Sequence, residues 1–245
     1  MTDPLFSWDN AAEITQPRLH VFLYGGTGAG KTISAASFPE PIILSPANEN
    51  GVLSLMGRQI PFKRISGSKD LLEAIDWLEA TQAKDPNDLP GQTLVWDSIS
   101  HYAELVIEEI SSTRKGGMDM QGWGQLATHF RSVQQRLRNL DLHVVFTSLA
   151  EVLVNDTGGV IGGRPKLSGG AKEMLPSACD IVAYMDVRDS ARQGAQPVYR
   201  CYTRPKSGYV ARTRFPAIPS EMTIGLEPGQ TLWDQIRPFV GGSSQ

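Results

Sequence analysis

The sequence is poor in the residues that form disulfide frameworks and zinc sites. It holds two cysteines, Cys179 and Cys201, and four histidines among its 245 residues, and these lack metal-ligand spacing. No apolar run approaches the roughly 18 residues of a membrane span. The first ten residues, MTDPLFSWDN, lack the basic and apolar regions of a signal peptide. We therefore expect a cytoplasmic protein with reduced cysteines and no membrane partner.

Two long segments of the chain each carry charges of almost entirely one sign. Residues 70–109 contain ten acidic side chains and one basic one, whereas residues 188–214 contain seven basic side chains and one acidic one. One interpretation is a pair of oppositely charged, solvated faces. The other is that the basic segment contacts phosphate, from a nucleotide or a nucleic acid backbone, which the net charge of −3 does not exclude.

The composition is otherwise that of a globular protein, with 40% hydrophobic and 20% charged residues. The expected organisation is an N-terminal arm over residues 1–17, a core over residues 18–240 and a disordered tail over residues 241–245. The arm is polar but carries two aromatic residues, Phe6 and Trp8. Two alternatives stay open for these aromatics: docking of the arm on a neighbouring subunit, or packing on the core of the same chain.

Apolar runs and helical periodicity alternate along the core. The apolar runs predict strands over residues 19–24, 41–46, 61–66, 93–97, 142–148 and 180–187. The periodic segments predict helices over residues 31–38, 69–81, 99–111, 124–140 and about 230–240. This alternation is typical of an α/β fold, with a mainly parallel sheet flanked by helices.

The C-terminal part and two loops depart from that alternation. Residues 197–204 and 208–215 flank the turn signal Pro205–Gly208 and predict a C-terminal β-hairpin. Residues 112–123 and 151–176 are rich in glycine and polar side chains and receive no predicted structure. Long loops of this kind in a compact α/β domain are usually functional or mobile.

A phosphate-binding loop follows the first predicted strand. Residues 25–32, GGTGAGKT, fit the pattern G-x-x-x-x-G-K-S/T between a strand and a helix. Its glycines let backbone N–H groups converge on phosphate, Lys31 is expected to reach the β- and γ-phosphate oxygens, and the Thr32 hydroxyl to bind Mg²⁺. The cofactors predicted are therefore ATP and Mg²⁺. The predicted nucleotide-binding residues are Gly25, Gly26, Thr27, Gly28, Ala29, Gly30, Lys31 and Thr32.

Three further side chains are expected around the phosphates. Asp97 ends the apolar strand TLVWD and is the candidate second Mg²⁺ ligand, or a helix cap. Because Ser98 rather than glutamate follows it, the catalytic base must come from elsewhere. Glu49, after the strand PIILSP, is the best candidate, since strand ends on that edge meet the nucleotide. Thr147 or Ser148 either binds the γ-phosphate or the attacking water, or caps its strand.

These motifs in succession resemble those of the RecA-like ATPases. The nearest resemblance is to the compact ATP-binding proteins of bacteriophages, including the Sak-type single-strand annealing proteins. It rests on GGTGAGKT, an acid after the second strand, LVWDS and the QGWG of residues 121–124, and it covers about residues 19–214. One departure is Leu149, where such proteins often carry a histidine or glutamine that senses the γ-phosphate.

The resemblance implies a RecA-like P-loop core that hydrolyses ATP and binds single-stranded DNA as a homo-oligomeric ring or filament. Recombination or strand annealing in the host cytoplasm, with a single-strand-binding protein as a further partner, is implied as well. In such proteins two loops face the DNA, and they correspond to the unassigned residues 112–123 and 151–176. For the basic side chains the alternative is solvated loop charge, and for the tryptophan a buried anchor at a helix start. The candidate DNA-binding residues are Arg114, Lys115, Trp123, Arg164, Lys166 and Lys172.

The resemblance also suggests a role for the basic turn at the C-terminal end. Arg204 and Lys206 lie two residues apart, so on an extended strand both would face the same way. They are candidates for cations that complete the ATP site of an adjacent subunit, or for contacts with DNA backbone. Two other functions stay open. These are a nucleotide-gated assembly or loading factor that acts on a protein, and a small-molecule kinase, which an arginine-poor lid disfavours.

Overall fold

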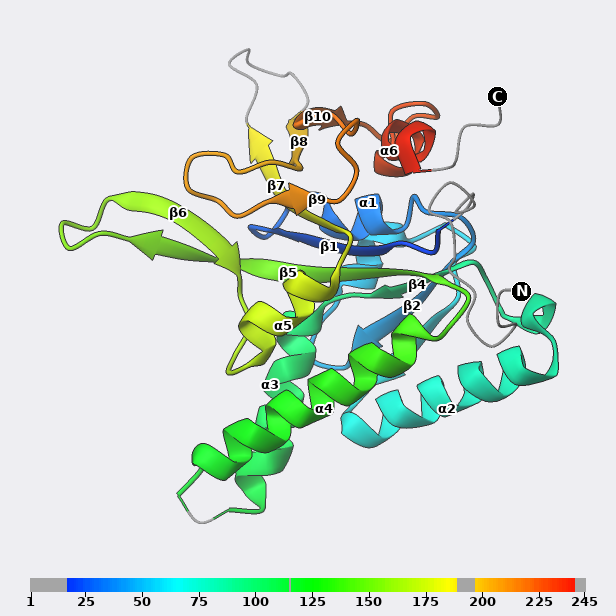
Figure 1. Ribbon diagram of the computed structural model, residues 1–245, viewed down its shortest axis with the longest axis vertical. Helices are drawn as coiled ribbons and strands as arrows, with labels where there is room; N and C mark the ends of the chain where they lie inside the picture. Colours follow the sequence, from blue (N-terminus) through cyan, green and yellow to red (C-terminus); the bar gives the residue numbers. More distant parts are fainter. Residues whose placement is uncertain (1–16, 115, 189–196, 241–245) are drawn as a thin grey trace, which may run out of the picture.

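The computed structural model describes residues 17–114, 116–188 and 197–240, which form a ten-stranded sheet with helices on both faces (Figure 1). The strand order is β10-β8-β7-β1-β5-β4-β2-β3, with β6 paired to β5 and β9 to β7. The strands are β1 His20–Gly25, β2 Pro41–Pro46, β3 Phe62–Ile65, β4 Thr93–Trp96, β5 His143–Val154, β6 Val160–Pro165, β7 Ile181–Arg188, β8 Val198–Tyr202, β9 Arg212–Thr213 and β10 Glu221–Ile224.

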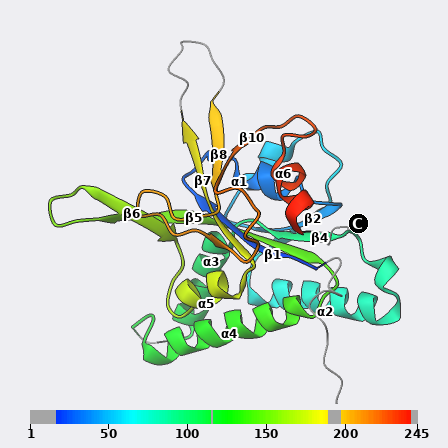
Figure 2. The same ribbon diagram turned by 45° about the horizontal axis from the view of Figure 1, so that its top comes forward.

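The helices cover the two faces unequally. Helices α2, α3, α4 and α5 lie on one face, and α1 and α6 lie on the other (Figures 1 and 2). Their bounds are α1 Lys31–Ala35, α2 Ser68–Lys84, α3 Ile99–Ser112, α4 Met120–Arg138, α5 Ala171–Ala178 and α6 Leu232–Val240, with short 3₁₀ turns η2 Gly51–Leu55 and η3 Pro86–Asp88. In the described part of the chain, no helix combines the length and apolar character that crossing a membrane requires.

Strand β1 shows why the central strands are apolar throughout. All six of its residues are buried, because helices cover both faces of the sheet. Successive side chains point to opposite faces, so Phe22 and Tyr24 join the core beneath α2–α5 while Val21 and Leu23 join the core beneath α1 and α6. The pairing is parallel from β7 through β1, β5, β4 and β2 to β3. The predicted α/β fold class is therefore confirmed.

The C-terminal strands pair differently from the prediction. Strand β8 pairs antiparallel with β7 and β10, and the short β9 pairs with β7, so residues 197–204 and 208–215 do not form the predicted hairpin with each other. The turn predicted at residues 205–208 does form, since the backbones of Lys206 and Tyr209 exchange hydrogen bonds. Strand β8 lies instead against β7, where Cys201 joins the core beneath α1 and α6.

The two segments without predicted structure are partly regular. Strand β5 runs on to Val154 and turns back as β6, and α5 follows, so residues 151–176 are largely a β-hairpin and a helix. Helix α4 begins at Met120, earlier than predicted, because the Asp119 carboxylate accepts a hydrogen bond from the Gly122 N–H and caps it. The arm over residues 1–16 and the tail over residues 241–245 lie outside the described residues, so both assignments stay predictions.

Candidate active site

The phosphate-binding loop joins the end of β1 to the start of α1. Gly28 and Gly30 both have φ near 79°, a left-handed conformation that favours glycine. The tyrosine ring of Tyr199, from β8, lies 3.1 Å from the position that a Cβ on Gly30 would take. The loop of residues 25–32 therefore depends on its glycines both for backbone shape and for the close approach of a neighbouring strand.

Lys31 crosses this loop from the first residue of α1. Its ammonium donates to the carbonyl oxygens of Gly25, at 3.1 Å, and Gly26, at 2.7 Å. Burial lowers the pKa of Lys31, while the nearby carboxylates of Asp97 and Glu49 oppose that shift. The cation thus stands over the loop whose amides are the expected phosphate ligands, as the sequence predicts.

Thr32 and Asp97 form the candidate Mg²⁺ site. The Thr32 hydroxyl donates to Asp97 Oδ2 at 2.7 Å, and Asp97 directly follows β4 with its side chain buried. Burial raises the pKa of Asp97, whereas hydrogen bonds from Thr147 and Thr32 lower it. A hydroxyl and a carboxylate beside a phosphate loop fit Mg²⁺, which prefers oxygen ligands and usually binds to few protein groups.

Thr147 lies behind Asp97 rather than in the cavity. It is fully buried in β5, and its hydroxyl donates to Asp97 Oδ1. The expected contact of Thr147 with γ-phosphate or water is therefore replaced by a contact with the carboxylate. Its hydrogen bond fixes the orientation of the candidate metal ligand, so a positioning role for Thr147 is a prediction.

Glu49 reaches the same site from the loop after β2. Its Oε2 accepts a hydrogen bond from the Ser98 N–H at 2.7 Å and lies 3.0 Å from His101 Nδ1. The side chain is 18% exposed and lines the cavity together with Lys31, Thr32 and Asp97. The structure thus brings the candidate base next to the candidate metal ligand, as expected for strand ends that meet at one edge of a parallel sheet.

The loop that carries Glu49 is held from two sides. From β3, the Arg64 guanidinium donates to the Glu49 carbonyl oxygen and to Asn50 Oδ1. From α3, the His101 carbonyl accepts a hydrogen bond of 3.1 Å from the Asn48 side chain. Gly51 allows a further close approach, since a Cβ there would lie 2.7 Å from Asp97 Oδ2. These contacts fix the loop and aim the carboxylate into the cavity.

The cavity has a volume of about 520 Å³, and His101 and Tyr199 are among the lining side chains that the sequence did not predict. His101 stands in the first turn of α3, where its Nδ1 also lies 2.8 Å from Ser98 Oγ. Tyr199 comes from β8, far away in the sequence. The spacing of Ser98 and His101, three residues apart at a helix start, is a signal that could have identified the histidine. Leu149 lines the cavity at the position where a polar γ-phosphate sensor was expected.

The two candidate cations of the C-terminal turn lie away from the cavity of their own chain. The Arg204 guanidinium donates to the carbonyl oxygens of Thr203 and Pro216, and the Lys206 ammonium lies 3.6 Å from a Glu221 carboxylate oxygen. Residues 203–208 form bends and a turn, so the expected shared face of an extended strand does not occur. A role in the site of another subunit, or on DNA, stays a prediction.

The candidate DNA-binding residues near α4 have structural roles as well. Arg114 forms an ion pair with the capping Asp119, and its side chain is 16% exposed. Trp123, in the first turn of α4, is 38% exposed and lies 3.2 Å from the position of a Cβ on Gly169. Lys115 lies outside the described residues. Trp123 is therefore not a fully buried anchor, and base stacking by its ring stays a prediction.

The other candidates lie on or beside the β5–β6 hairpin, which projects from the body of the molecule (Figures 1 and 2). Arg164 and Lys172 both pair with Glu151, at 2.9 and 3.2 Å, and Lys166 lies 3.5 Å from Glu104. The connection between α3 and α4 lies at a different end of the molecule from the hairpin tip (Figure 1). The two expected DNA loops are thus not brought together at their tips within one chain.

Comparisons with known proteins agree with this geometry. The family described as an AAA domain matches residues 18–215. A crystal structure of a KaiC-like protein from the archaeon Pyrococcus horikoshii OT3 is similar in fold, with a TM-score of 0.52 at 15% identity, over 90% of this chain and 93% of that chain. No curated protein matches significantly. The chain therefore belongs to the AAA domain family, on a RecA-like P-loop fold shared with a KaiC-like protein.

Proposed function

We propose that this protein is a Mg²⁺-dependent ATPase that binds single-stranded DNA and promotes phage-type recombination or strand annealing as a homo-oligomer. One observation carries the ATPase part: the cavity with the phosphate loop also contains the Thr32–Asp97 pair and the Glu49 carboxylate. This set supplies phosphate binding, metal binding and a base, which together suffice for phosphoryl transfer to water.

Each side chain has a defined task in that reaction. Mg²⁺, when bound, offsets the negative charge that the phosphate oxygens carry as the γ-phosphoryl group transfers. Thr32 and Asp97 are the residues that would hold it, and Lys31 binds the phosphates. Glu49 accepts the proton of the attacking water at its carboxylate, while the Ser98 N–H and His101 keep that carboxylate in place.

The DNA part is supported by the course of β5. Thr147, bonded to Asp97, and the exposed hairpin residues Val152 and Val154 belong to the same strand. The cations beside this hairpin are Arg164, Lys166 and Lys172, which sit in partly exposed ion pairs with glutamates. Such pairs contribute only about 0–1 kcal/mol, so DNA phosphate can compete with the carboxylates.

A measurement of ATPase rate with and without single-stranded DNA tests the proposal. We expect stimulation by DNA, and we expect DNA binding to weaken steeply with salt and to differ between ATP and ADP. The Lys31→Ala variant should lose most turnover while it stays folded. Normal turnover in that variant would contradict the nucleotide site, whereas a normal ATPase that ignores DNA would contradict only the DNA part.

One observation favours a second candidate function, an ATP-controlled assembly factor that acts on a protein partner. The β5–β6 hairpin carries four aliphatic side chains that are each at least half exposed: Val152, Val154, Val160 and Ile161. An exposed apolar patch of this kind is typical of a protein-binding surface. Replacement of Val160 and Ile161 by serine should leave DNA binding intact if a protein is the target, and weaken it if DNA contacts the hairpin.

A further inference from the structure

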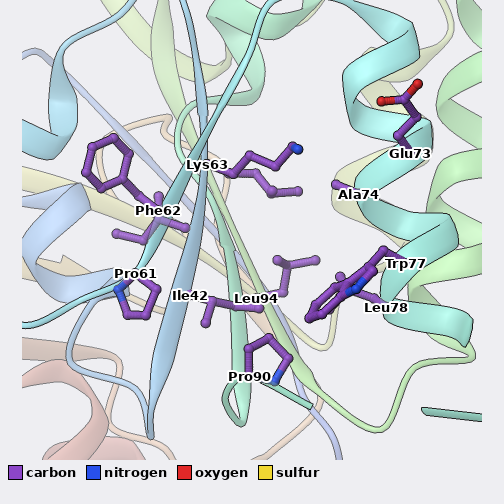
Figure 3. Close-up of a pocket in the computed structure, with 12 residues that line it drawn as sticks. Ile42, Pro61, Phe62, Lys63, Glu73, Ala74, Trp77, Leu78, Pro90 and Leu94 are labelled. Carbon is purple, nitrogen blue, oxygen red and sulfur yellow. The ribbon is translucent and has the colours of Figure 1, made fainter. Parts of the chain in front are cut away.

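A groove of about 410 Å³ lies between the edge of the sheet and helix α2, and none of its lining residues belongs to the nucleotide cavity (Figure 3). Ten of its twelve lining residues are apolar, and Lys63 and Glu73 are the polar ones. Ile42 and Leu94 lie on the sheet side, whereas Ala74 and Trp77 face them from α2 (Figure 3). The groove is thus large enough, and apolar enough, to take bulky side chains from another segment.

Strand β3 has a second apolar hollow on its other side. That hollow, of about 290 Å³, contains Leu53 and Met56, and Phe62 borders both hollows. Leu53, Met56, Phe62 and Trp77 are 62, 84, 55 and 56% exposed. In the described residues β3 pairs with β2 alone, so the backbone groups of its outer edge are open as well. Proteins usually cover an apolar edge of this kind, because it otherwise recruits strands from other chains.

We propose that residues 1–16 of the same chain cover this edge by adding an extended segment beside β3. The segment contains Leu5, Phe6 and Trp8. In an extended segment Phe6 and Trp8 point to one side and Leu5 to the other, which matches an edge with an apolar hollow on each side. The segment has three acidic residues and no lysine or arginine, whereas the two hollows are lined by three cations, Arg58, Lys63 and Arg64, and by one acid, Glu73. Charge therefore favours the same placement.

The distance from Pro17 to the groove is short enough for residues 9–16 to bridge it. Pro17, the first described residue, borders a hollow together with Gln92, and Pro90, two residues before Gln92, lines the groove. A segment added beside β3 lies five strand spacings from β1, about 24 Å in all. The nine Cα–Cα steps from Trp8 to Pro17 span up to about 30 Å when extended. A tether of this length holds the segment at roughly millimolar effective concentration, which favours docking on its own chain over docking on another copy.

Disulfide trapping in the full-length chain tests this placement. Lys63→Cys is combined with a cysteine at one of the four residues 5–8 in turn, and the protein is oxidised at high dilution. We expect an intrachain disulfide whose yield does not depend on protein concentration. Thr157→Cys, on the exposed β5–β6 turn, replaces Lys63→Cys in the matched control. The native Cys179 and Cys201 are buried, and burial raises the pKa of the Cys201 thiol to about 12, so neither interferes.

The groove itself is tested by a second pair of variants. Trp77→Ala should lower the yield of the intrachain disulfide several-fold, and Leu226→Ala, which removes an equally exposed apolar side chain elsewhere, should leave it unchanged. A disulfide that forms only between chains, and rises with protein concentration, would assign the edge to a second copy and overturn the proposal. A yield no higher than that of the Thr157→Cys control would overturn it as well. The ATPase rate plays no part in these readouts.

Discussion

Glu49 Oε2 lies 3.0 Å from His101 Nδ1, so the candidate base and a histidine of α3 share one hydrogen-bonded group with Ser98. The Ser98 N–H donates to the same carboxylate oxygen. The Ser98 hydroxyl lies 2.8 Å from the same His101 nitrogen, so Ser98 links the two side chains. If Glu49 is the base, its chemistry should therefore depend on residues that do not themselves touch the reacting atoms.

Replacement of Glu49 by glutamine separates binding from chemistry. The amide keeps the size of the side chain but cannot accept the proton of water, so kcat should fall about 100-fold or more while ATP still binds. Nucleotide binding measured by fluorescence, beside steady-state ATPase kinetics, checks both halves. Glu173→Gln, on the exposed side of α5, is a suitable control. Normal turnover in Glu49→Gln would place the base elsewhere, among Glu104, Glu108 and Glu109.

His101 is expected to act as a positioning residue for Glu49. His101→Ala removes the imidazole that lies 3.0 Å from the carboxylate, and we expect kcat to fall about 10- to 100-fold with little change in the KM for ATP, because the carboxylate loses its orientation. His101→Asn places an amide N–H near the position of Nδ1 and should restore part of the rate. Equal losses in the two variants, or a change confined to KM, would argue against this role.

A substitution of Thr147 tests the candidate metal site through its ligand Asp97. Its hydroxyl donates to Asp97 Oδ1, and Thr147→Val removes that bond at nearly constant volume. We expect the Mg²⁺ concentration for half-maximal ATPase to rise about 10-fold or more, because a residue that hydrogen-bonds to a metal ligand tunes the affinity for the metal. Thr147→Ser should behave as the parent does. An unchanged Mg²⁺ dependence in the valine variant would remove Thr147 from the site.

The parts of the site that sequence could predict are those with fixed local spacing. The loop of residues 25–32 must follow a strand and precede a helix, so the sequence predicts both its position and its role as a phosphate-binding loop. Asp97 and Glu49 could be placed because the carboxyl ends of neighbouring parallel strands meet at one edge. The fold class followed from the same alternation of strands and helices.

The parts that sequence could not predict depend on which strands become neighbours. Tyr199 reaches Gly30 only because β8 pairs with β7, whereas the turn signal at residues 205–208 favoured a different partner for β8. The sequence favours DNA contacts for the lysines and arginine of residues 151–176, with solvated loop charge as the alternative. In the fold, β5 continues past its apolar part and brings Glu151 opposite Arg164 and near Lys172, whereas Lys166 lies near Glu104 of α3. Pairing of this kind is set by tertiary contacts, not by local pattern.

The stability of the fold should depend on pH through His20. Burial lowers the pKa of His20 to about 4, whereas a histidine in an unfolded chain titrates near 6.5. Between these values the unfolded chain binds the proton more tightly, so the free energy of unfolding falls as pH drops from about 6.5 to about 4. For His20 this amounts to roughly 3 kcal/mol over the whole interval.

The variant His20→Phe isolates that contribution. In the described residues His20 Nδ1 has no hydrogen-bond partner, so the phenyl ring loses no bond there. Denaturant unfolding at about pH 7 and about pH 4.5 should show a smaller difference in the variant than in the parent chain. An identical difference would mean that other groups carry the acid sensitivity. Such groups include His143, whose pKa burial also lowers to about 4, and below about pH 5 the carboxylates Asp141 and Glu151, whose pKa values ion pairs lower.

Arg204 and Lys206 pose a question that mixed assemblies can answer. Neither residue lines the ATP cavity of its own chain, so a role in catalysis requires a neighbouring subunit. A double Arg204→Ala/Lys206→Ala chain keeps its phosphate loop, and a Lys31→Ala chain keeps both cations. If the cations act across an interface, two inactive proteins should regain part of the ATPase rate when mixed, because some interfaces then combine an intact loop with intact cations. The gain per such interface should be large, since a cation of this kind contributes about 10³–10⁵ in rate.

The control for that mixture is proof of co-assembly, by light scattering or by a tag on one component. Co-assembled mixtures without recovered activity would argue against cations supplied by a neighbour. The double variant alone distinguishes the remaining role. Normal basal ATPase together with weaker binding of single-stranded DNA, and a shallower dependence of that binding on salt, would move both residues to a DNA contact, because each lost phosphate contact lowers the salt slope by about one.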